Sequence, residues 1–205
     1  MKRFLFAAAC ILLLTGCGEK EDPLTVNTLT LEAEGKLTAV SVADFDSEVL
    51  DLDEFKEQAA AEIGDYNERA GEERITLAAC SGKEGHVTVE ISYLSAQDYQ
   101  NFNSILCATG MLDDLTGDEG LETNTYFYDE SGTLRTTLGE IIASEGSETW
   151  KYLVVGEPLL VTVPGRILFT SGGATSEGRG SVQTGANMTD RILLDAPCYI
   201  IYEEI

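Results

Sequence analysis

Apolar and polar residues alternate along much of the first half of the chain. The alternation covers residues 24–31 and 36–45, and a glycine turn separates the two runs. Runs of this length and period around a turn predict a β-hairpin. Residues 74–80 and 86–94 repeat the pattern, with 81–85 as the connecting loop. The sequence therefore predicts two antiparallel hairpins in this half of the chain.

Each predicted hairpin is followed by residues with a helical period. Over residues 51–70, apolar side chains recur at intervals of three and four, as on one face of an amphipathic helix. These side chains are Leu52, Phe55, Ala59, Ile63, Tyr66 and Ala70. Asp51 with Glu54 resembles a capping box, and Gly71 is expected to end the helix. A second helix is predicted to begin at Ser95. Its buried stripe would consist of Tyr99, Phe102, Ile105 and Thr109.

The second half of the chain contains more predicted strands than helices. The strands are expected at residues 126–128, 150–155, 159–163, 166–170 and 199–203. Pro164-Gly165 is expected to join two of them as a tight turn, because proline presets φ and glycine accepts a positive φ. Residues 138–143 predict a short helix. Residues 113–122 and 171–190 predict loops, and the second is long enough to be functional, mobile or to contain a strand near Val182.

The composition is that of a folded protein with a strong acid excess. Of 205 residues, 43% are hydrophobic and 24% charged, and 13 Lys and Arg stand against 36 Asp and Glu, for a net charge of −23. Nucleic acid and anionic membrane surfaces are therefore disfavoured as electrostatic partners. We expect a single α+β domain over residues 24–205, built of antiparallel hairpins each followed by an amphipathic helix, with a strand-rich C-terminal part.

The first residues have the pattern of a secretory signal peptide. Met1-Lys2-Arg3 is basic, and residues 4–14 are apolar without a charge. This apolar run is too short for a membrane span, which needs about 20 residues. A short basic start followed by a short apolar run is typical of export signals. The sequence therefore predicts a protein that is exported from the cytoplasm.

Leu14-Thr15-Gly16-Cys17 resembles the lipobox of bacterial lipoproteins. The resemblance implies that residues 1–16 are removed as the signal peptide and that Cys17 becomes the lipidated first residue. Residues 17–23 would then comprise the lipidated cysteine and a polar tether. Acyl chains on Cys17 would hold the protein at the extracytoplasmic side of the cell membrane. The alternative is an ordinary secreted protein with a chance cysteine near its cleavage site.

Five segments resemble a group of uncharacterised lipoproteins of anaerobic Gram-positive gut bacteria. They are residues 40–45, the acid-capped helix from Asp51, residues 92–99, residues 161–167 and residues 199–202. Together these segments span most of the chain after Cys17. The resemblance brings no known activity. It implies an extracytoplasmic protein tethered to the membrane by lipid.

Three cysteines remain beyond Cys17. Cys80 is expected near the end of a strand, Cys107 on or beside the apolar stripe of the second helix, and Cys198 before the last strand. Free cysteine is among the most buried residue types, which favours core packing for all three. An odd number cannot close entirely into intramolecular disulfides, but one pair among the three remains open.

His86 is the one imidazole available as a general base. It lies six residues from Cys80 in the same predicted hairpin, so the two side chains are candidates for a nucleophile and its base. A hairpin at the surface offers no pocket that excludes water. A solvent-facing histidine is therefore favoured, and a single histidine also excludes metal sites built on several imidazoles. The sequence assigns no catalytic residue.

Acidic and aromatic residues supply the last candidates. Two acidic groups invite a calcium hypothesis, since calcium binds carboxylate oxygens. They are Asp113, Asp114, Asp118 and Glu119, and Asp44 with Asp46. Neither group has EF-hand spacing, so solvated loops are favoured and no metal site or cofactor is predicted. Two aromatic pairs share strand parity and are candidates for a sugar-binding platform, although core packing is commoner. They are Tyr126 with Tyr128 and Trp150 with Tyr152.

Two classes of function follow. The favoured one is a non-enzymatic, membrane-anchored envelope lipoprotein with a binding or scaffolding role toward an envelope protein or glycan. It predicts an exposed apolar or aromatic patch, or the loop 171–190 beside a groove. The alternative is an extracytoplasmic hydrolase with an unrecognised site, which needs a concave pocket where titratable groups converge.

Overall fold

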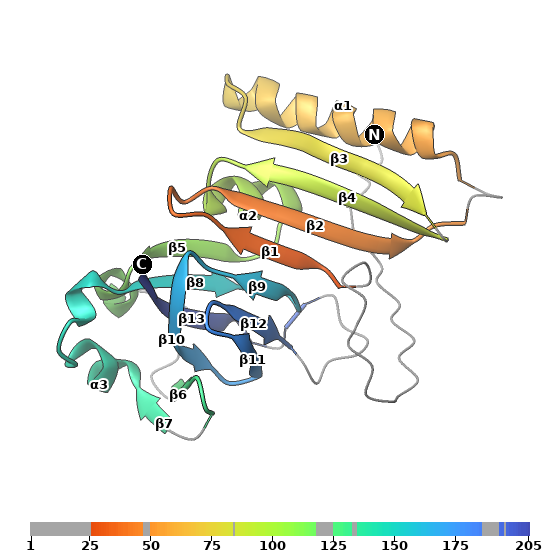
Figure 1. Cartoon of the computed structure of the whole chain (residues 1–205). Coiled ribbons are helices and arrows are strands. Elements are labelled where there is room, and N and C mark those ends of the chain that lie inside the picture. The colour runs from red at the N-terminus through yellow and green to blue at the C-terminus, as the bar shows by residue number, and fades with distance from the viewer. Residues whose placement is uncertain are drawn as a thin grey trace.

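The strands of the chain form two sheets (Figure 1). The computed structural model describes residues 26–46, 50–83, 85–117, 125–132, 135–185, 193–194 and 196–205. The seven-stranded sheet has the order β11 (Ala174–Gly178), β12 (Ser181–Thr184), β9 (Leu160–Thr162), β1 (Thr28–Leu31), β2 (Leu37–Asp44), β4 (His86–Tyr93) and β3 (Ile75–Lys83). The six-stranded sheet has the order β5 (Cys107–Met111), β8 (Lys151–Val155), β13 (Cys198–Glu204), β10 (Gly165–Ser171), β6 (Tyr126–Asp129) and β7 (Arg135–Thr137).

The helices of the described residues are α1 (Leu52–Ala70), α2 (Ala96–Asn103) and α3 (Leu138–Ile142). Short 3₁₀ turns lie at Leu112–Gly117 and Ser147–Thr149. The predicted α+β class with a strand-rich C-terminal part is therefore confirmed. No helix in this part of the chain combines the length and hydropathy needed to cross a bilayer.

The first predicted hairpin and helix are confirmed. β1 and β2 pair as antiparallel neighbours, and α1 follows them. The Asp51 carboxylate caps α1 by accepting hydrogen bonds from the backbone N–H groups of Asp53 and Glu54, at 2.8 and 3.1 Å. Gly71 ends the helix with a φ of 77°, a conformation that glycine adopts without strain. Asn67 then fastens α1 to β3, because its amide group bonds to the backbone of Ile75 in both directions.

The second hairpin is also confirmed, but the predicted second helix is too long. β3 and β4 pair in antiparallel fashion, and Ser95 caps α2. The helix ends at Asn103, because Ser104 takes a left-handed conformation with a φ of 58° and donates its N–H to the carbonyl oxygen of Gln100. The chain then continues as β5, paired with β8. The expectation that Cys107 and Thr109 lie in a helix was therefore wrong.

The predicted strands of the second half are present, with two corrections. Residues 159–163 and 166–170 correspond to β9 and β10, which lie in different sheets, so Pro164-Gly165 carries the chain from one sheet to the other. Gly165 has no positive φ. It is required by close approach instead, since a Cβ there would lie 2.0 Å from the carbonyl oxygen of Glu203. The expected loop 171–190 contains the hairpin β11–β12, and Val182 is buried as the strand hypothesis requires.

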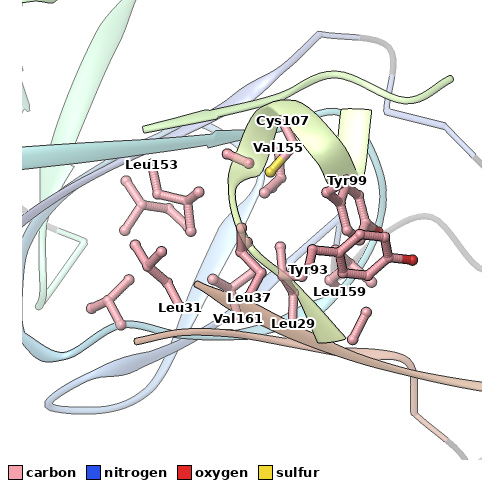
Figure 2. Packing of buried hydrophobic residues seen from close by; sticks show 14 of the residues in the cluster. Leu29, Leu31, Leu37, Tyr93, Tyr99, Cys107, Leu153, Val155, Leu159 and Val161 are labelled. Atoms are coloured by element: carbon pink, nitrogen blue, oxygen red, sulfur yellow. The ribbon is translucent and has the colours of Figure 1, made fainter. Parts of the chain in front are cut away.

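Two hydrophobic clusters lie on opposite faces of the six-stranded sheet. The larger fills the space between the two sheets and includes side chains from α1 and α2. Figure 2 shows its labelled members: Leu29, Leu31, Leu37, Tyr93, Tyr99, Cys107, Leu153, Val155, Leu159 and Val161. The smaller cluster lies on the far face and comprises Leu112, Leu115, Phe127, Ile141, Val154, Tyr199 and Ile201. Because Val154 and Val155 are adjacent, alternate residues of β8 serve the two clusters.

Candidate functional site

The seven-stranded sheet has one covered face and one open face. On the covered face, α1, α2 and the six-stranded sheet pack against it to form the larger hydrophobic cluster. Ile63 of α1 and Tyr99 of α2 both belong to this cluster, together with Leu37 and Tyr93 of the sheet. In Figure 1, α2 lies behind β4 and β2, whose opposite face is turned toward the viewer. None of the helices in the described residues therefore packs on the open face.

A continuous row of hydroxyl side chains crosses the open face. The strand registers pair Thr76 with Ser92, Ser92 with Thr38, and Thr38 with Thr30. They continue from Thr30 to Thr162 and from Thr162 to Ser181. We call these six residues the hydroxyl row. It takes one residue from each of β3, β4, β2, β1, β9 and β12. Neighbouring strands lie about 4.8 Å apart, so the row is roughly 24 Å long.

Strict alternation produces the hydroxyl row. Each of its six residues has an apolar chain neighbour that points into the larger cluster on the covered face. These neighbours are Leu77, Ile91, Ala39, Leu29, Val161 and Val182. Side chains of successive strand residues point to opposite faces of a sheet, so each hydroxyl residue points to the open one. Thr30 and Thr76 are exposed, and the other four are half-buried.

The hydroxyl groups retain much of their hydrogen-bonding capacity. Thr162 Oγ1 and Ser181 Oγ lie 3.1 Å apart and bond to each other. Thr76 Oγ1 donates to a carboxylate oxygen of Glu73 at 3.2 Å, from the segment just before β3. A hydroxyl group can donate one hydrogen bond and accept two. Each of these three groups can therefore accept further bonds from a molecule lying on the face.

Two neighbouring rows of the open face carry a single charge, whereas Asp44, His86 and Lys83 lie at one end of the same face. Beside the hydroxyl row runs a second row across the same strands, which we call the adjacent row. It consists of Ala79, Glu90, Val40, Thr28, Leu160, Gln183 and Thr175. Of the thirteen positions in the two rows, Glu90 alone carries a charge. In a chain of which 24% is charged, the two rows form an unusually neutral surface.

The structure separates Cys80 from His86. Cys80 pairs with Val89, whereas His86 pairs with Lys83, three residues further along β3. Three strand residues span about 10 Å, and an odd separation puts the two side chains on opposite faces. His86 Nδ1 instead lies 3.2 Å from a carboxylate oxygen of Asp44. Burial raises the pKa of Cys80, which disfavours its thiolate form. The two residues therefore cannot act as nucleophile and base in this fold.

The predicted core role is confirmed for the other two cysteines. Cys107 and Cys198 are buried in the larger cluster, and all three thiols are free. Burial raises the pKa of Cys107 and of Cys198 to about 12. Cys107 of β5 and Cys198 of β13 each pair with Val155 of β8, so the two cysteines lie on opposite sides of that strand. Two strand spacings, about 9.6 Å, exceed the Cα separation that a disulfide spans.

Two carboxyl groups with shifted pKa values lie on the covered side of the seven-stranded sheet, Asp98 buried and Glu157 half-buried. Asp98 of α2 accepts hydrogen bonds from Arg74 at 2.9 and 3.1 Å, from Tyr66 at 3.1 Å, and from Ser95. Burial would raise the pKa of Asp98, but the bonds from Arg74, Ser95 and Tyr66 outweigh it, so its pKa is lowered. Asp98 thereby joins β3, α1 and α2 as a fully bonded structural anion.

Glu157, in the connection between β8 and β9, is the second of these carboxyl groups and is half-buried. It accepts a hydrogen bond from the Tyr99 hydroxyl, and no cation is paired with it in the described structure. Burial raises the pKa of Glu157, and the bond from Tyr99 offsets only part of that effect. Tyr99 and nearby Cys107 also have raised pKa values because of burial. Neither thiolate nor phenolate is therefore favoured beside Glu157, so this group of residues has no activated nucleophile.

The acidic and aromatic candidates do not form sites in the described residues. Asp118 and Glu119 lie outside them, and within them no group of three or more His, Cys, Asp or Glu residues could hold a metal ion. Trp150 and Tyr152 pack against the smaller hydrophobic cluster. Tyr126 is exposed, but the guanidinium carbon of Arg135 lies 3.4 Å from its ring centroid. Trp150 and Tyr152 therefore serve core packing, and one face of the Tyr126 ring is occupied by Arg135.

Cys17, the predicted lipidation site, lies outside the described residues. Comparison with known proteins gives no further guide: no family model, no curated protein and no solved structure matches this chain. The hydroxyl row was missed by the sequence analysis. Its local signal, a hydroxyl residue beside an apolar one, is visible in Thr28-Leu-Thr-Leu31 and Val161-Thr162. The signal becomes a surface feature only through the pairing of six strands.

Proposed function

We propose that this protein is a membrane-anchored envelope lipoprotein that binds a partner through the open face of its seven-stranded sheet. The basic start, the apolar run of residues 4–14 and the lipobox-like Leu14–Cys17 support export and lipid attachment at Cys17. The lipid anchor would hold the domain at the extracytoplasmic side of the cell membrane. The role is binding or scaffolding rather than catalysis.

The observation that carries the binding role is the hydroxyl row. A sheet face that is merely solvated in an acid-rich protein tolerates charged side chains, and the rest of this chain has many. The open face instead aligns six hydroxyl side chains across six strands, with one charge in the two rows. Such a surface offers many directional hydrogen bonds without long-range attraction.

The positions of the titratable residues argue against the hydrolase alternative. A hydrolase needs a nucleophile or an activated water beside a base in a site that excludes water. In the described structure, the one histidine is bonded to Asp44 at the surface, and Cys80 lies on the other face of the hairpin. The carboxyl groups of Asp98 and Glu157 are each hydrogen-bonded within the protein.

The lipid anchor is tested by replacing Cys17. We expect Cys17→Ser to abolish labelling with radioactive palmitate and to leave the leader uncleaved. Replacement of Cys80 by Ser is the control, since Cys80 lies in β3, far along the chain from the predicted cleavage site. Palmitate labelling that persists in Cys17→Ser, or natural protein whose Cys17 thiol is unmodified by mass spectrometry, would contradict the anchor.

The binding face is tested with delipidated envelope fragments and the detergent-solubilised full chain. We expect wild-type protein to sediment with the fragments. The double variant Thr30→Val/Thr162→Val removes two central hydroxyl groups and should bind at least tenfold more weakly, because each hydrogen bond contributes about 1 kcal/mol. Thr88→Val is the matched control, since Thr88 is on the open face but pairs with Val42 and Ser81, outside both rows. Equal binding by all three proteins would refute this function.

A further inference from the structure

We infer that the partner is a neutral glycan chain that lies across the strands, along the hydroxyl row. The inference rests on the proposed function, which assigns binding to the open face, and adds the chemical class of the ligand. It depends on three properties of the two rows: their charge, their side-chain types and their spacing.

The charge excludes ionic polymers. The chain has a net charge of −23, so an anionic polysaccharide, a nucleic acid or an anionic lipid surface would be repelled. The acids that contact or adjoin the hydroxyl row are Glu90 in the adjacent row, Glu73, which accepts a hydrogen bond from Thr76, and Glu32, which accepts one from Thr38. A cationic polymer would be attracted by the acidic residues of the whole protein surface. The two rows, which contain one acid, would not bind it in preference to the rest of that surface. A partner specific to the open face is therefore uncharged.

The side-chain types disfavour a protein partner. Protein-binding surfaces concentrate their energy in aromatic, arginine and methionine side chains that fill pockets on the partner. None of the thirteen positions in the two rows carries one of these residues. The larger apolar side chains there, Val40 and Leu160, lie in the adjacent row and are half-buried. The open face thus lacks the apolar centre that a protein interface needs.

The hydroxyl row matches the chemistry of a sugar chain. A sugar hydroxyl, like that of serine or threonine, both donates and accepts hydrogen bonds, so the two can pair in either direction. The row presents one hydroxyl side chain about every 4.8 Å, which is close to the length of one pyranose unit in an extended glycan. An oligosaccharide of roughly five units would span the row from Thr76 on β3 to Ser181 on β12. The glycan would therefore run perpendicular to the strands seen side by side in Figure 1.

Isothermal titration calorimetry with defined oligosaccharides tests this inference on the detergent-solubilised full chain. The neutral probes are maltohexaose, cellohexaose, mannohexaose and the hexamer of N-acetylglucosamine, and hexagalacturonate is the anionic probe. We expect at least one neutral hexasaccharide to bind, with its disaccharide at least tenfold weaker and hexagalacturonate not bound. Length dependence is expected because a disaccharide reaches about two hydroxyl groups of the row.

Variants of the hydroxyl row connect the binding to the structure. Thr30→Val/Thr162→Val should weaken the neutral hexasaccharide at least tenfold, whereas Thr30→Ser/Thr162→Ser, which keeps both hydroxyl groups, should stay within threefold of wild type. Thr88→Val should stay within twofold. If the valine double variant does not fold, Ser92→Ala and Thr76→Val replace it, each with an expected loss of about threefold.

The outcomes separate this inference from the proposed function. If no neutral hexasaccharide binds while envelope binding still depends on Thr30 and Thr162, the glycan inference is overturned and the binding face stands. The same holds if hexagalacturonate binds as tightly as the neutral probes, or if the envelope component retained by the row is a protein. If envelope binding is also indifferent to the row, both proposals fail.

Discussion

The two faces of the seven-stranded sheet are built by the same strands under opposite demands. Thr30 and Leu29 are chain neighbours, yet Leu29 is fully buried and Thr30 is exposed. In all six strands of the hydroxyl row, an apolar residue of the larger cluster is the chain neighbour of a hydroxyl residue on the open face. The covered face had to match α1, α2 and the second sheet in shape. The open face has no such packing partner in the described structure, and one row across six of its strands still consists of hydroxyl side chains only.

The largest expected effect separates the two faces by stability. Leu29→Ala should lower the free energy of unfolding by about 2–5 kcal/mol, because it removes buried methyl groups and leaves a cavity. Thr30→Val, one residue away, should change it by less than about 0.5 kcal/mol. Urea denaturation followed by far-UV circular dichroism measures both. A comparable loss for Thr30→Val would show that the open face is itself covered. The proposed difference between the two faces of the sheet would then be wrong.

A smaller effect is expected at the polar cluster that fastens the covered face. Asp98→Asn should lower the free energy of unfolding at pH 7 by about 2 kcal/mol, because charge-assisted bonds to Arg74 are replaced by weaker ones. The pKa of Asp98 is lowered in the folded protein. Its stabilising contribution is therefore complete above the unfolded pKa, about 3.9, and is lost as pH falls through the folded value.

The pH dependence distinguishes this charge effect from a simple loss of packing. The stability difference between wild type and Asp98→Asn should shrink as denaturation is repeated at progressively lower pH. Gln97→Ala, an exposed substitution on the same helix, provides the control and should be indifferent to pH. A difference for Asp98→Asn that stays constant down to pH 3 would show that the carboxylate charge does not stabilise this cluster.

Glu157 should show the opposite pH dependence, with a smaller effect. Its pKa is raised by burial in the folded protein, so protonated Glu157 is stabilised, and that contribution is complete below the unfolded pKa, about 4.3. The contribution is lost as pH rises through the folded pKa. Glu157→Gln keeps the hydrogen bond to Tyr99 without the charge. It should therefore match wild type at low pH and exceed it by up to about 1 kcal/mol at pH 8.

Thermal denaturation of wild type and Glu157→Gln between pH 4 and pH 8 measures this effect. Glu177→Gln, in the exposed strand β11, is the matched control and should follow wild type at every pH. Opposite trends for Asp98→Asn and Glu157→Gln would show that the hydrogen-bond partners determine how each of these two carboxyl groups affects stability. Parallel trends would contradict the assignment of a raised pKa to Glu157.

Local patterns in the sequence predicted local structure. The period of residues 51–70, with Asp51 before them and Gly71 after them, was sufficient for α1, because the cap, the apolar stripe and the stop agree. The predicted second helix was wrong beyond Asn103, since Ser104 takes a left-handed conformation that is uncommon for serine. The sequence pattern explained Gly165 by a positive φ in a tight turn, which was wrong. Glycine is needed there because the backbone of Glu203, a residue distant in the chain, lies too close for a Cβ.

The candidate site lay beyond such patterns. Thr30 and Thr38 belong to the first predicted hairpin, and they pair directly in the structure. The row continues into Thr162 through the parallel pairing of β1 with β9, which joins distant parts of the chain and has no turn to fix its register. A binding role predicted an exposed apolar or aromatic patch, or the loop 171–190 beside a groove. The surface that we propose for binding carries hydroxyl groups instead.

The smallest expected effect is a near absence of salt dependence in binding. Screening weakens interactions between charges, and the Debye length falls from about 10 Å at 0.1 M to about 3 Å at 1 M salt. With Glu90 as the one charge in the two rows, screening has little to act on. We expect the retention of wild-type protein by delipidated envelope fragments to change less than about twofold over this range.

The Glu90→Lys variant sharpens the same test. If the partner is neutral, reversing the one charge of the two rows should leave both the affinity and its salt response within about twofold of wild type. If the partner is anionic, Glu90→Lys should bind more tightly at low salt and lose that gain as salt is added. If the affinity of wild-type protein falls tenfold with salt, the open face binds its partner by charge. The low charge of the two rows would then not select a neutral partner.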